Sequence, residues 1–523
     1  MRSNRIKQGC LTLLLAACGL AGCSSPPPPT TRQLAGDALA AMGGAVRLAT
    51  VHSVTMTGGS GSRWQLGQAV RPDDPDMPAT LQRVTETVDR ATGRAAFDYD
   101  ITTVDGFTQR RKEILTTWNG GRIGIEQAGD RAPEVMSPAG LFSWGTQNSP
   151  VTALRRNPID VALATTHVDA SQVAEDRDLN GRPVKFGRVT FGDETLGVYF
   201  DPKSHFLVAY ETMDTEPILG DIAARYVLDD YRSVDGVMLP HRVTISKGAA
   251  PFAAVQFTSA AIDDAKALSV FTIPPMLAAT AAQVAAADDY YTPLTLTVIG
   301  NGVYFAQAFS HHSLVVEFPA YLVVVEAPYT EAQSHTLVRL LASQFPTKPV
   351  RYAIVTHPHF DHIGGVRGIA AAGATILVAR PHEAVIRALL TARHTNPEDE
   401  LDSKRRAGAI VGGIQVYAGD TLISDGKQAL ELHMVSASSH ADRMVIAYVP
   451  SAKVLFQSDL FFPASGSGAS GLSAQLLQTV RALNLDVRTN AGGHGGVAPF
   501  DELVAAVDAS NRNDRGLQAN ASR

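Results

Sequence analysis

The chain has 523 residues, a formal charge of −6 at pH 7, 45% apolar residues and 18% charged residues. A single ordinary domain rarely reaches this length, so we expect two or three domains with well-filled cores. A mildly acidic chain without a lysine- or arginine-rich run lacks the electrostatic footprint of a nucleic-acid-binding protein.

The cysteines define one region of the chain. All three, Cys10, Cys18 and Cys23, lie within the first 23 residues. The sequence after residue 23 therefore has no thiol that could bind a metal, act as a nucleophile or form an internal disulfide.

The N-terminus has the layout of a secretory signal peptide, which we predict over residues 1–22. A basic start precedes an apolar run over residues 9–21, which is too short to span a bilayer. Leu20-Ala21-Gly22-Cys23 resembles the bacterial lipoprotein box, in which the cysteine is lipidated. Cys18 fits the same pattern, but cleavage there would leave a shorter apolar region, so we favour Cys23.

A proline-rich stretch over residues 23–33 predicts an extended tether after this cysteine. The resemblance implies a cell-envelope protein held on the membrane by a lipid anchor. Ser24 implies the outer membrane of a Gram-negative cell, on its periplasmic side. A cleaved signal with a soluble product is the alternative. The expected partners are this membrane and a small-molecule substrate, with no nucleic acid, and the oligomeric state stays open.

Residues 34–275 predict a mostly antiparallel β domain. A helix is expected over residues 34–50, and short alternating runs broken by turn residues follow as far as residue 273. In its pattern of short alternating runs and turns, this half resembles the curved half-barrel of periplasmic lipoprotein carriers. The alanine-rich stretch within residues 276–292 predicts a linker, with a helix as one possibility.

Residues 293–511 predict a layered α/β domain, because strand-like and helix-like runs alternate there. A polar C-terminal tail is expected over residues 512–523. The predicted strands cover residues 294–299, 313–318, 321–325 and 350–355, and the predicted helices cover residues 330–343 and 382–392.

The densest cluster of candidate metal ligands lies in this second half. Three histidines and one aspartate fall within six positions: His357, His359, Asp361 and His362. Imidazole nitrogens and carboxylate oxygens are ligands that zinc-type ions favour. The preceding strand-like run places the cluster at the carboxyl end of a strand, where open α/β sheets carry their sites. Three later residues also follow strand-like runs or lie in loops of small residues: His440, Asp459 and His494.

These seven residues resemble the motifs of the metallo-β-lactamase-fold superfamily, in type and in order, over about residues 293–510. The resemblance implies an α/β fold, namely a four-layer αβ/βα sandwich with the metals at one edge. In this chain a mostly antiparallel β domain would precede it.

Carried over to this chain, the resemblance implies two zinc ions. It assigns His357, His359 and His440 to the first ion, Asp361, His362 and His494 to the second, and Asp459 to both as a bridge. Two adjacent cations require negative charge between them, which a bridging carboxylate and a hydroxide supply. Metal ions lower the pKa of bound water toward neutrality, so a hydroxide nucleophile exists at working pH. Asp361 is the expected catalytic residue, which orients that hydroxide or relays its proton.

The expected function is an exported dinuclear zinc hydrolase that uses a metal-bound hydroxide on a small ester, thioester, lactone or lactam. Another divalent metal is possible. His359 favours hydrolysis, because di-iron relatives that reduce oxygen carry glutamate there. One alternative is a mononuclear iron enzyme similar to persulfide dioxygenases. The other is a non-catalytic envelope-binding lipoprotein with a metal-binding domain. No motif identifies the substrate, because one fold hosts many chemistries.

Several nearby residues carry secondary expectations. Glu326 stands where the superfamily often has an aspartate that supports the ligand loop. His311 and His312 are expected in a hydrogen-bonded turn rather than in contact with substrate. His382 and His394 are expected at the surface. The pair Gly364-Gly365 is expected to give steric relief beside the metals.

Overall fold

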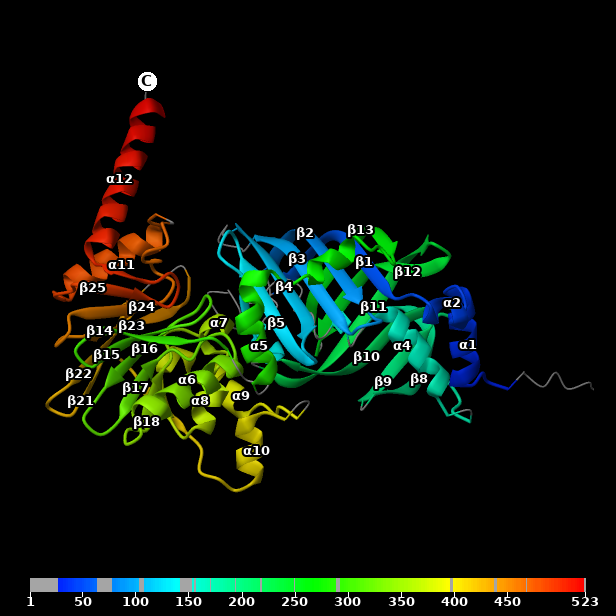
Figure 1. Ribbon diagram of the computed structural model, residues 1–523, viewed down its shortest axis with the longest axis horizontal. Coiled ribbons are helices and arrows are strands. Elements are labelled where there is room, and N and C mark those ends of the chain that lie inside the picture. The colour runs from blue at the N-terminus through cyan, green and yellow to red at the C-terminus, as the bar shows by residue number, and fades with distance from the viewer. Residues whose placement is uncertain are drawn as a thin grey trace, which may run out of the picture.

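The computed structural model describes residues 27–521 except 64–77, 103–107, 142–152, 155–156, 170, 193, 217–218, 249, 288–291, 396–397, 437–439 and 467. The predicted signal peptide and the predicted lipidation site at Cys23 lie outside these residues. Figure 1 shows a large N-terminal sheet beside a C-terminal layered domain.

The N-terminal domain is built on one antiparallel sheet. Within the described residues it has thirteen strands in the order β6-β5-β4-β3-β2-β1-β13-β12-β11-β10-β9-β8-β7, so pairing of β1 with β13 joins its two halves. In chain order the strands are β1 (Ser53–Arg63), β2 (Pro78–Asp89), β3 (Arg94–Thr102), β4 (Thr108–Trp118), β5 (Gly121–Ala128), β6 (Glu134–Met136), β7 (Glu175–Leu179), β8 (Arg182–Phe191), β9 (Glu194–Phe200), β10 (Leu207–Glu216), β11 (Gly220–Val234), β12 (Val237–Lys247) and β13 (Ala250–Ile262).

Short helices pack on one face of this sheet. The region predicted as a single helix over residues 34–50 forms two, α1 (Thr31–Ala41) and α2 (Ala45–Ala49). Gly43 and Gly44 separate them, because both adopt positive φ angles, 118° and 93°, that end a right-handed helix. These helices and α4 (Pro158–Ala164) bury their apolar side chains against β8 to β12.

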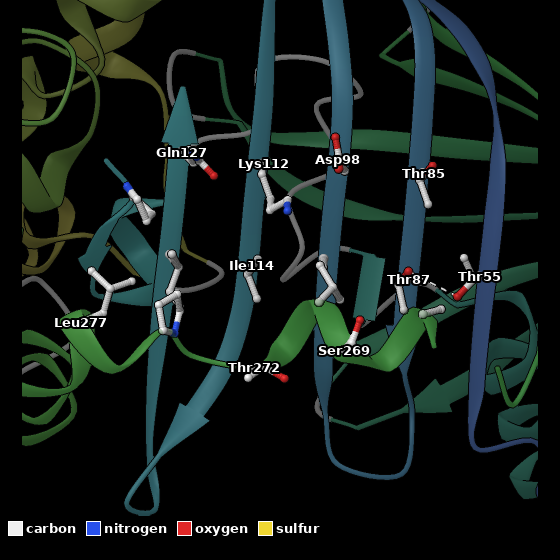
Figure 2. Close-up of a pocket in the computed structure, with 16 residues that line it drawn as sticks. Thr55, Thr85, Thr87, Asp98, Lys112, Ile114, Gln127, Ser269, Thr272 and Leu277 are labelled. Atoms are coloured by element: carbon white, nitrogen blue, oxygen red, sulfur yellow. Dashed lines mark hydrogen bonds between the residues drawn. The ribbon is translucent and has the colours of Figure 1, made fainter. Parts of the chain in front are cut away.

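The opposite face of β4 and β5 is covered by η3 (Ala267–Phe271), η4 (Pro275–Leu277) and α5 (Ala278–Ala286). By length and composition, residues 267–286 are the one described segment that could cross a membrane. The structure divides this segment at Pro274-Pro275, and Ala281 and Val284 pack on the sheet. A pocket of about 440 Å³ lies between it and the strands (Figure 2).

The C-terminal domain has two facing sheets with helices on both outer surfaces. One sheet is β14 (Thr295–Gly300), β15 (Val303–Gln307), β16 (Ser313–Glu317), β17 (Leu322–Val325), β18 (Val350–Ile354), β19 (Thr375–Ala379) and β20 (Ile414–Tyr417). The other is β21 (Thr421–Ser424), β22 (Ala429–Ser436), β23 (Arg443–Val449), β24 (Val454–Gln457), β25 (Thr489–Gly492) and β26 (Val497–Pro499). Apolar side chains of both sheets interdigitate in a shared core.

Two sets of helices complete the four layers. The first sheet is covered by α6 (Glu331–Gln344), α8 (Val366–Ala371), α9 (Glu383–Thr391) and α10 (Glu400–Arg406), and the second by α11 (Gly471–Ala482) and α12 (Asp501–Ala521). The predicted αβ/βα sandwich preceded by an antiparallel β domain is confirmed. The helix α12 crosses the predicted boundary between residues 511 and 512.

Candidate metal centre

The predicted histidine-rich motif begins just after the strand β18 and ends in a short helix, α7 (Phe360–Ile363). Gly364 and Gly365 follow it. A Cβ on Gly364 would lie 2.2 Å from the carbonyl oxygen of Tyr329, and one on Gly365 would lie 2.1 Å from Ser334 Oγ. Both glycines therefore allow α7 to pack against the segment that leads into α6. The steric relief expected beside the metals serves this neighbouring segment instead.

The structure brings all seven predicted residues together. His440 follows β22, Asp459 follows β24, and His494 follows β25, so the ends of strands from both sheets meet here. Two groups of side chains each present ligand atoms within 4.8 Å of one another. The first is His357, His359, His440 and Asp459, and the second is His311, Asp361, His362 and His494.

Asp459 lies between the two groups. Its Oδ2 is 2.9 Å from His357 Nε2, 3.0 Å from His362 Nε2 and 3.0 Å from His440 Nε2. Its Oδ1 is 2.8 Å from His494 Nε2. One carboxylate oxygen offers two lone pairs, so it cannot satisfy three imidazoles by hydrogen bonds alone. This geometry suits a carboxylate that bridges two cations.

Two imidazoles of the cluster, those of His362 and His494, have raised pKa values because carboxylates surround them. Burial opposes a charge on His362, but Asp459 and Glu326 outweigh burial and raise its pKa well above the usual value. Burial is likewise outweighed at His494, where Asp459 raises the pKa to about 9. Burial favours a neutral Asp459, yet His362 and His494 hold its pKa well below the usual range. Without metal, protons on these imidazoles supply the positive charge that a bound cation would supply.

The donor atoms fit zinc-type ions. Among the residues that the structure describes, His357 Nε2 and His362 Nε2 lie near Asp459 without the geometry of a hydrogen bond, and the buried Asp361 Oδ1 has no hydrogen-bond partner. Buried polar atoms are normally paired, and here they converge on one region. The opposite ring nitrogens are engaged, since His357 Nδ1 lies 3.1 Å from Thr356 Oγ1 and His362 Nδ1 lies 3.0 Å from Ser458 Oγ. These contacts turn both Nε2 atoms toward the cluster.

Glu326 takes the supporting role expected of an aspartate. It is fully buried and has a φ angle of 67°, so its backbone turns sharply after β17. Thr356 Oγ1 donates a hydrogen bond of 2.5 Å to Glu326 Oε1, and Oε2 lies 3.0 Å from His362 Nδ1. A Cβ on Gly493 would lie 2.8 Å from Oε2, so this glycine makes room for the longer side chain. Glutamate therefore orients the ligand loop in this chain.

His311 is the residue of the cluster that sequence reasoning did not assign to a metal. It is buried in the turn after β15, with Nε2 3.2 Å from Asp361 Oδ2. Its ring stacks on Tyr329 at 4.8 Å between centroids and meets the His494 ring at 4.3 Å. The expected hydrogen-bonded turn is present, but the contact with the site was missed. The paired histidines were the only signal in the sequence.

His382 and His394 are buried, so their predicted surface position is wrong. Nε2 of His382 donates to the carbonyl oxygen of Arg443 at 2.9 Å, which places the start of α9 against β23. His394 lies 4.0 Å from Asp399, in a buried polar group with Arg367. The partner of His382 lies 61 positions away in the sequence, which a local helical pattern cannot predict.

A four-layer sandwich with a histidine and aspartate cluster at its strand ends defines a class of metal-binding domain. Residues 308–494 match the model of the metallo-beta-lactamase superfamily, in agreement with the resemblance predicted from the sequence. A search of curated proteins finds no match.

Solved structures similar to the chain include three metallo-beta-lactamases. One from Pontibacter korlensis has 18% identity and a TM-score of 0.31, over 40% of this chain and 96% of that one. One from Hirschia baltica has 16% identity and a TM-score of 0.30, over 40% and 94%. FIM-1 from Pseudomonas aeruginosa, in its mono-zinc form, has 16% identity and a TM-score of 0.31, over 42% and 96%.

Proposed function

We propose that the protein is a hydrolase that works with two divalent metal ions, with zinc as the expected metal. The position of Asp459 between two groups of histidines carries this proposal, since one carboxylate faces Nε2 atoms of both groups within 3.0 Å. The substrate class is a small ester, thioester, lactone or lactam.

Each side chain has a role in this proposal. One ion would be held by His357, His359 and His440, the other by Asp361, His362 and His494 with His311 beside them, and Asp459 would be shared. When bound, the ions would supply a water-derived nucleophile near neutral pH and polarise the bond under attack. Asp361 stays ionised, because His362 and His311 lower its pKa well below the usual range against the effect of burial. Its ionised carboxylate can therefore accept hydrogen bonds and orient a water molecule at the site.

Metal analysis joined to a hydrolysis screen tests the proposal. We expect about two zinc ions per chain and hydrolysis of at least one ester, thioester, lactone or lactam probe. Asp459→Asn keeps the size of the side chain but removes its charge, and we expect it to lose metal and about 100-fold or more in activity. His433→Gln is the matched control, since His433 lies on β22 and contacts Asp420 and Glu431 instead of the cluster.

Other outcomes would overturn the proposal in different ways. One iron per chain with consumption of oxygen would indicate the dioxygenase-like alternative. Two metals with no hydrolysis of any probe would indicate a metal-binding lipoprotein without this activity. Loss of metal in His433→Gln would show that the assay reports misfolding.

We also propose that the protein is exported and anchored through a lipid on Cys23. The basic and apolar start of the chain and the Leu20-Ala21-Gly22-Cys23 segment support this. Cys23→Ala should move the protein from the membrane fraction to the soluble fraction, whereas Cys18→Ala should leave it in the membrane fraction. A Cys23→Ala protein that stays with the membrane would contradict the assignment.

A further inference from the structure

The turn between β15 and β16, residues 308–312, touches the second group of ligands with both of its histidines. His311 Nε2 lies 3.2 Å from Asp361 Oδ2. The backbone nitrogen of His312 donates to the carbonyl oxygen of Gly493 at 2.8 Å, and its Nε2 donates to that of Gly495 at 2.9 Å. His494 lies between those two glycines. The position of this turn therefore sets the position of two ligands.

The N-terminal domain holds this turn through Phe309. The Phe309 side chain is 2% exposed. It packs in an apolar cluster with four residues of the N-terminal domain, namely Leu115, Ala128, Met136 and Leu141. Arg131, after β5, lies over the ring at 5.1 Å and donates a hydrogen bond to the Phe309 carbonyl oxygen. One residue of the turn is thus fixed by both apolar and polar contacts from the other domain.

A second connection runs through Tyr329. Its ring stacks on His311 with an angle of 16° between planes, and its backbone nitrogen donates to the carbonyl oxygen of Asp361 at 2.9 Å. Its hydroxyl donates to Glu126 Oε1 on β5 at 2.6 Å. Glu126 forms an ion pair of 3.0 Å with Arg111 on β4, and both side chains are buried. A positive φ of 69° shows that surrounding contacts hold the Tyr329 backbone in an uncommon conformation.

We infer that the N-terminal domain is a positioning part of the second metal site, acting on His311, Asp361 and His494 through Phe309 and Tyr329. This inference rests on the proposed two-metal function. His311 Nδ1 lies 2.5 Å from Ser310 Oγ, which leaves Nε2 directed at Asp361. Partners that orient metal ligands in this way commonly change metal affinity by about 10- to 100-fold when they are removed. The contacts of Phe309 and Tyr329 lead to ligands of the second group, so we expect the second site to respond to their loss more strongly than the first.

Two variants of the full-length chain test the inference. Tyr329→Phe removes only the hydroxyl that reaches Glu126 and keeps the ring on His311. Arg131→Ala removes the bond to the Phe309 carbonyl from an exposed position, where the fold is less at risk. Asp221→Asn is the matched control. Asp221 accepts hydrogen bonds from Thr395 in a different contact between the two domains.

The measurement is titration of the metal-free proteins with cobalt(II), followed by its visible absorption, with circular dichroism as the test of folding. We expect Tyr329→Phe and Arg131→Ala to bind the first ion as the wild type does and the second about tenfold more weakly. Asp221→Asn should bind both ions normally. Normal binding of both ions by the two folded variants would overturn the inference, as would equal weakening at both sites.

This test separates the inference from the proposed function. A wild-type protein that binds two ions and hydrolyses no probe would remove the proposed function and leave the inference standing. A wild-type protein that hydrolyses a probe, with variants that bind both ions normally, would remove the inference alone. If Tyr329→Phe fails to fold, Arg131→Ala decides the question.

Discussion

Glu326 and Asp459 are buried carboxylates on opposite sides of the same histidine. Glu326 Oε2 lies 3.0 Å from Nδ1 of His362, and Asp459 Oδ2 lies 3.0 Å from Nε2 of that ring. Glu326 therefore orients the His362 ring through Nδ1, and Nε2 on the other side of the ring faces Asp459 and the rest of the cluster. Because Gly493 leaves room for the extra methylene of Glu326, the change from aspartate keeps this arrangement. Gly493, in a loop distant in the sequence, thus leaves the space that the Glu326 carboxylate occupies.

At the scale of a single residue, Glu86 leads to a prediction of how the stability of the protein depends on pH. It lies on β2 at an apolar pocket of about 70 Å³ together with Val88 and Phe257. Burial raises its pKa from 4.5 to about 7. A raised pKa in the folded state means that this residue contributes its full stability below about pH 4.5 and loses it as pH rises through about 7.

We therefore expect Glu86→Gln to match the wild type near pH 4.5 and to be more stable near pH 8. The full pKa shift would correspond to about 3 kcal/mol, but the side chain is only half-buried, so we expect a difference of about 1 to 2 kcal/mol. Urea unfolding of both proteins at the two pH values measures this. A difference in unfolding free energy that stays constant with pH would contradict the prediction.

At the scale of elements, the C-terminal domain was predictable because its signals are local. The expected strand over residues 350–355 is β18 (Val350–Ile354), and the expected helix over residues 330–343 is α6 (Glu331–Gln344). Candidate ligands could be found because each follows such a strand. The contact of His311 with Asp361 could not, since it depends on how a turn packs against residues 50 positions away.

The N-terminal sheet shows the same limit. Alternating runs predicted antiparallel strands, but the pairing of β1 with β13 joins residues about 200 positions apart. No local pattern specifies such a partner, so the order of the thirteen strands could not be predicted from the sequence. The alanine-rich segment predicted as a linker contains α5, whose small side chains pack closely on β5. An alanine-rich pattern does not reveal which surface it will meet.

At the scale of the whole molecule, the two domains share one buried core. Phe97 and Tyr99 of the N-terminal sheet belong to the same apolar cluster as Ala327 and Tyr329 of the C-terminal domain. The buried pair of Arg111 and Glu126 lies in the same region. Separating the domains would expose this apolar surface and this ion pair together, so we expect the two domains to unfold as one unit.

The tryptophans allow a direct test of that coupling. The chain has three, Trp64, Trp118 and Trp144, all in the N-terminal half, whereas every candidate metal ligand lies in the C-terminal domain. Tryptophan fluorescence therefore reports unfolding of a domain that supplies no candidate ligand. Zinc at about a hundred times its dissociation constant should stabilise the folded protein by about 2.7 kcal/mol.

If the domains unfold together, zinc will raise the unfolding midpoint seen by tryptophan fluorescence as much as the midpoint seen by circular dichroism. Asp459→Asn should show neither shift, because it lacks the charge shared by the two ligand groups. A zinc-dependent shift in circular dichroism without one in tryptophan fluorescence would mean that the domains unfold independently. The shared core and the buried ion pair at the interface favour a common shift, since the N-terminal sheet cannot lose its structure while the turn bearing Phe309 stays in place.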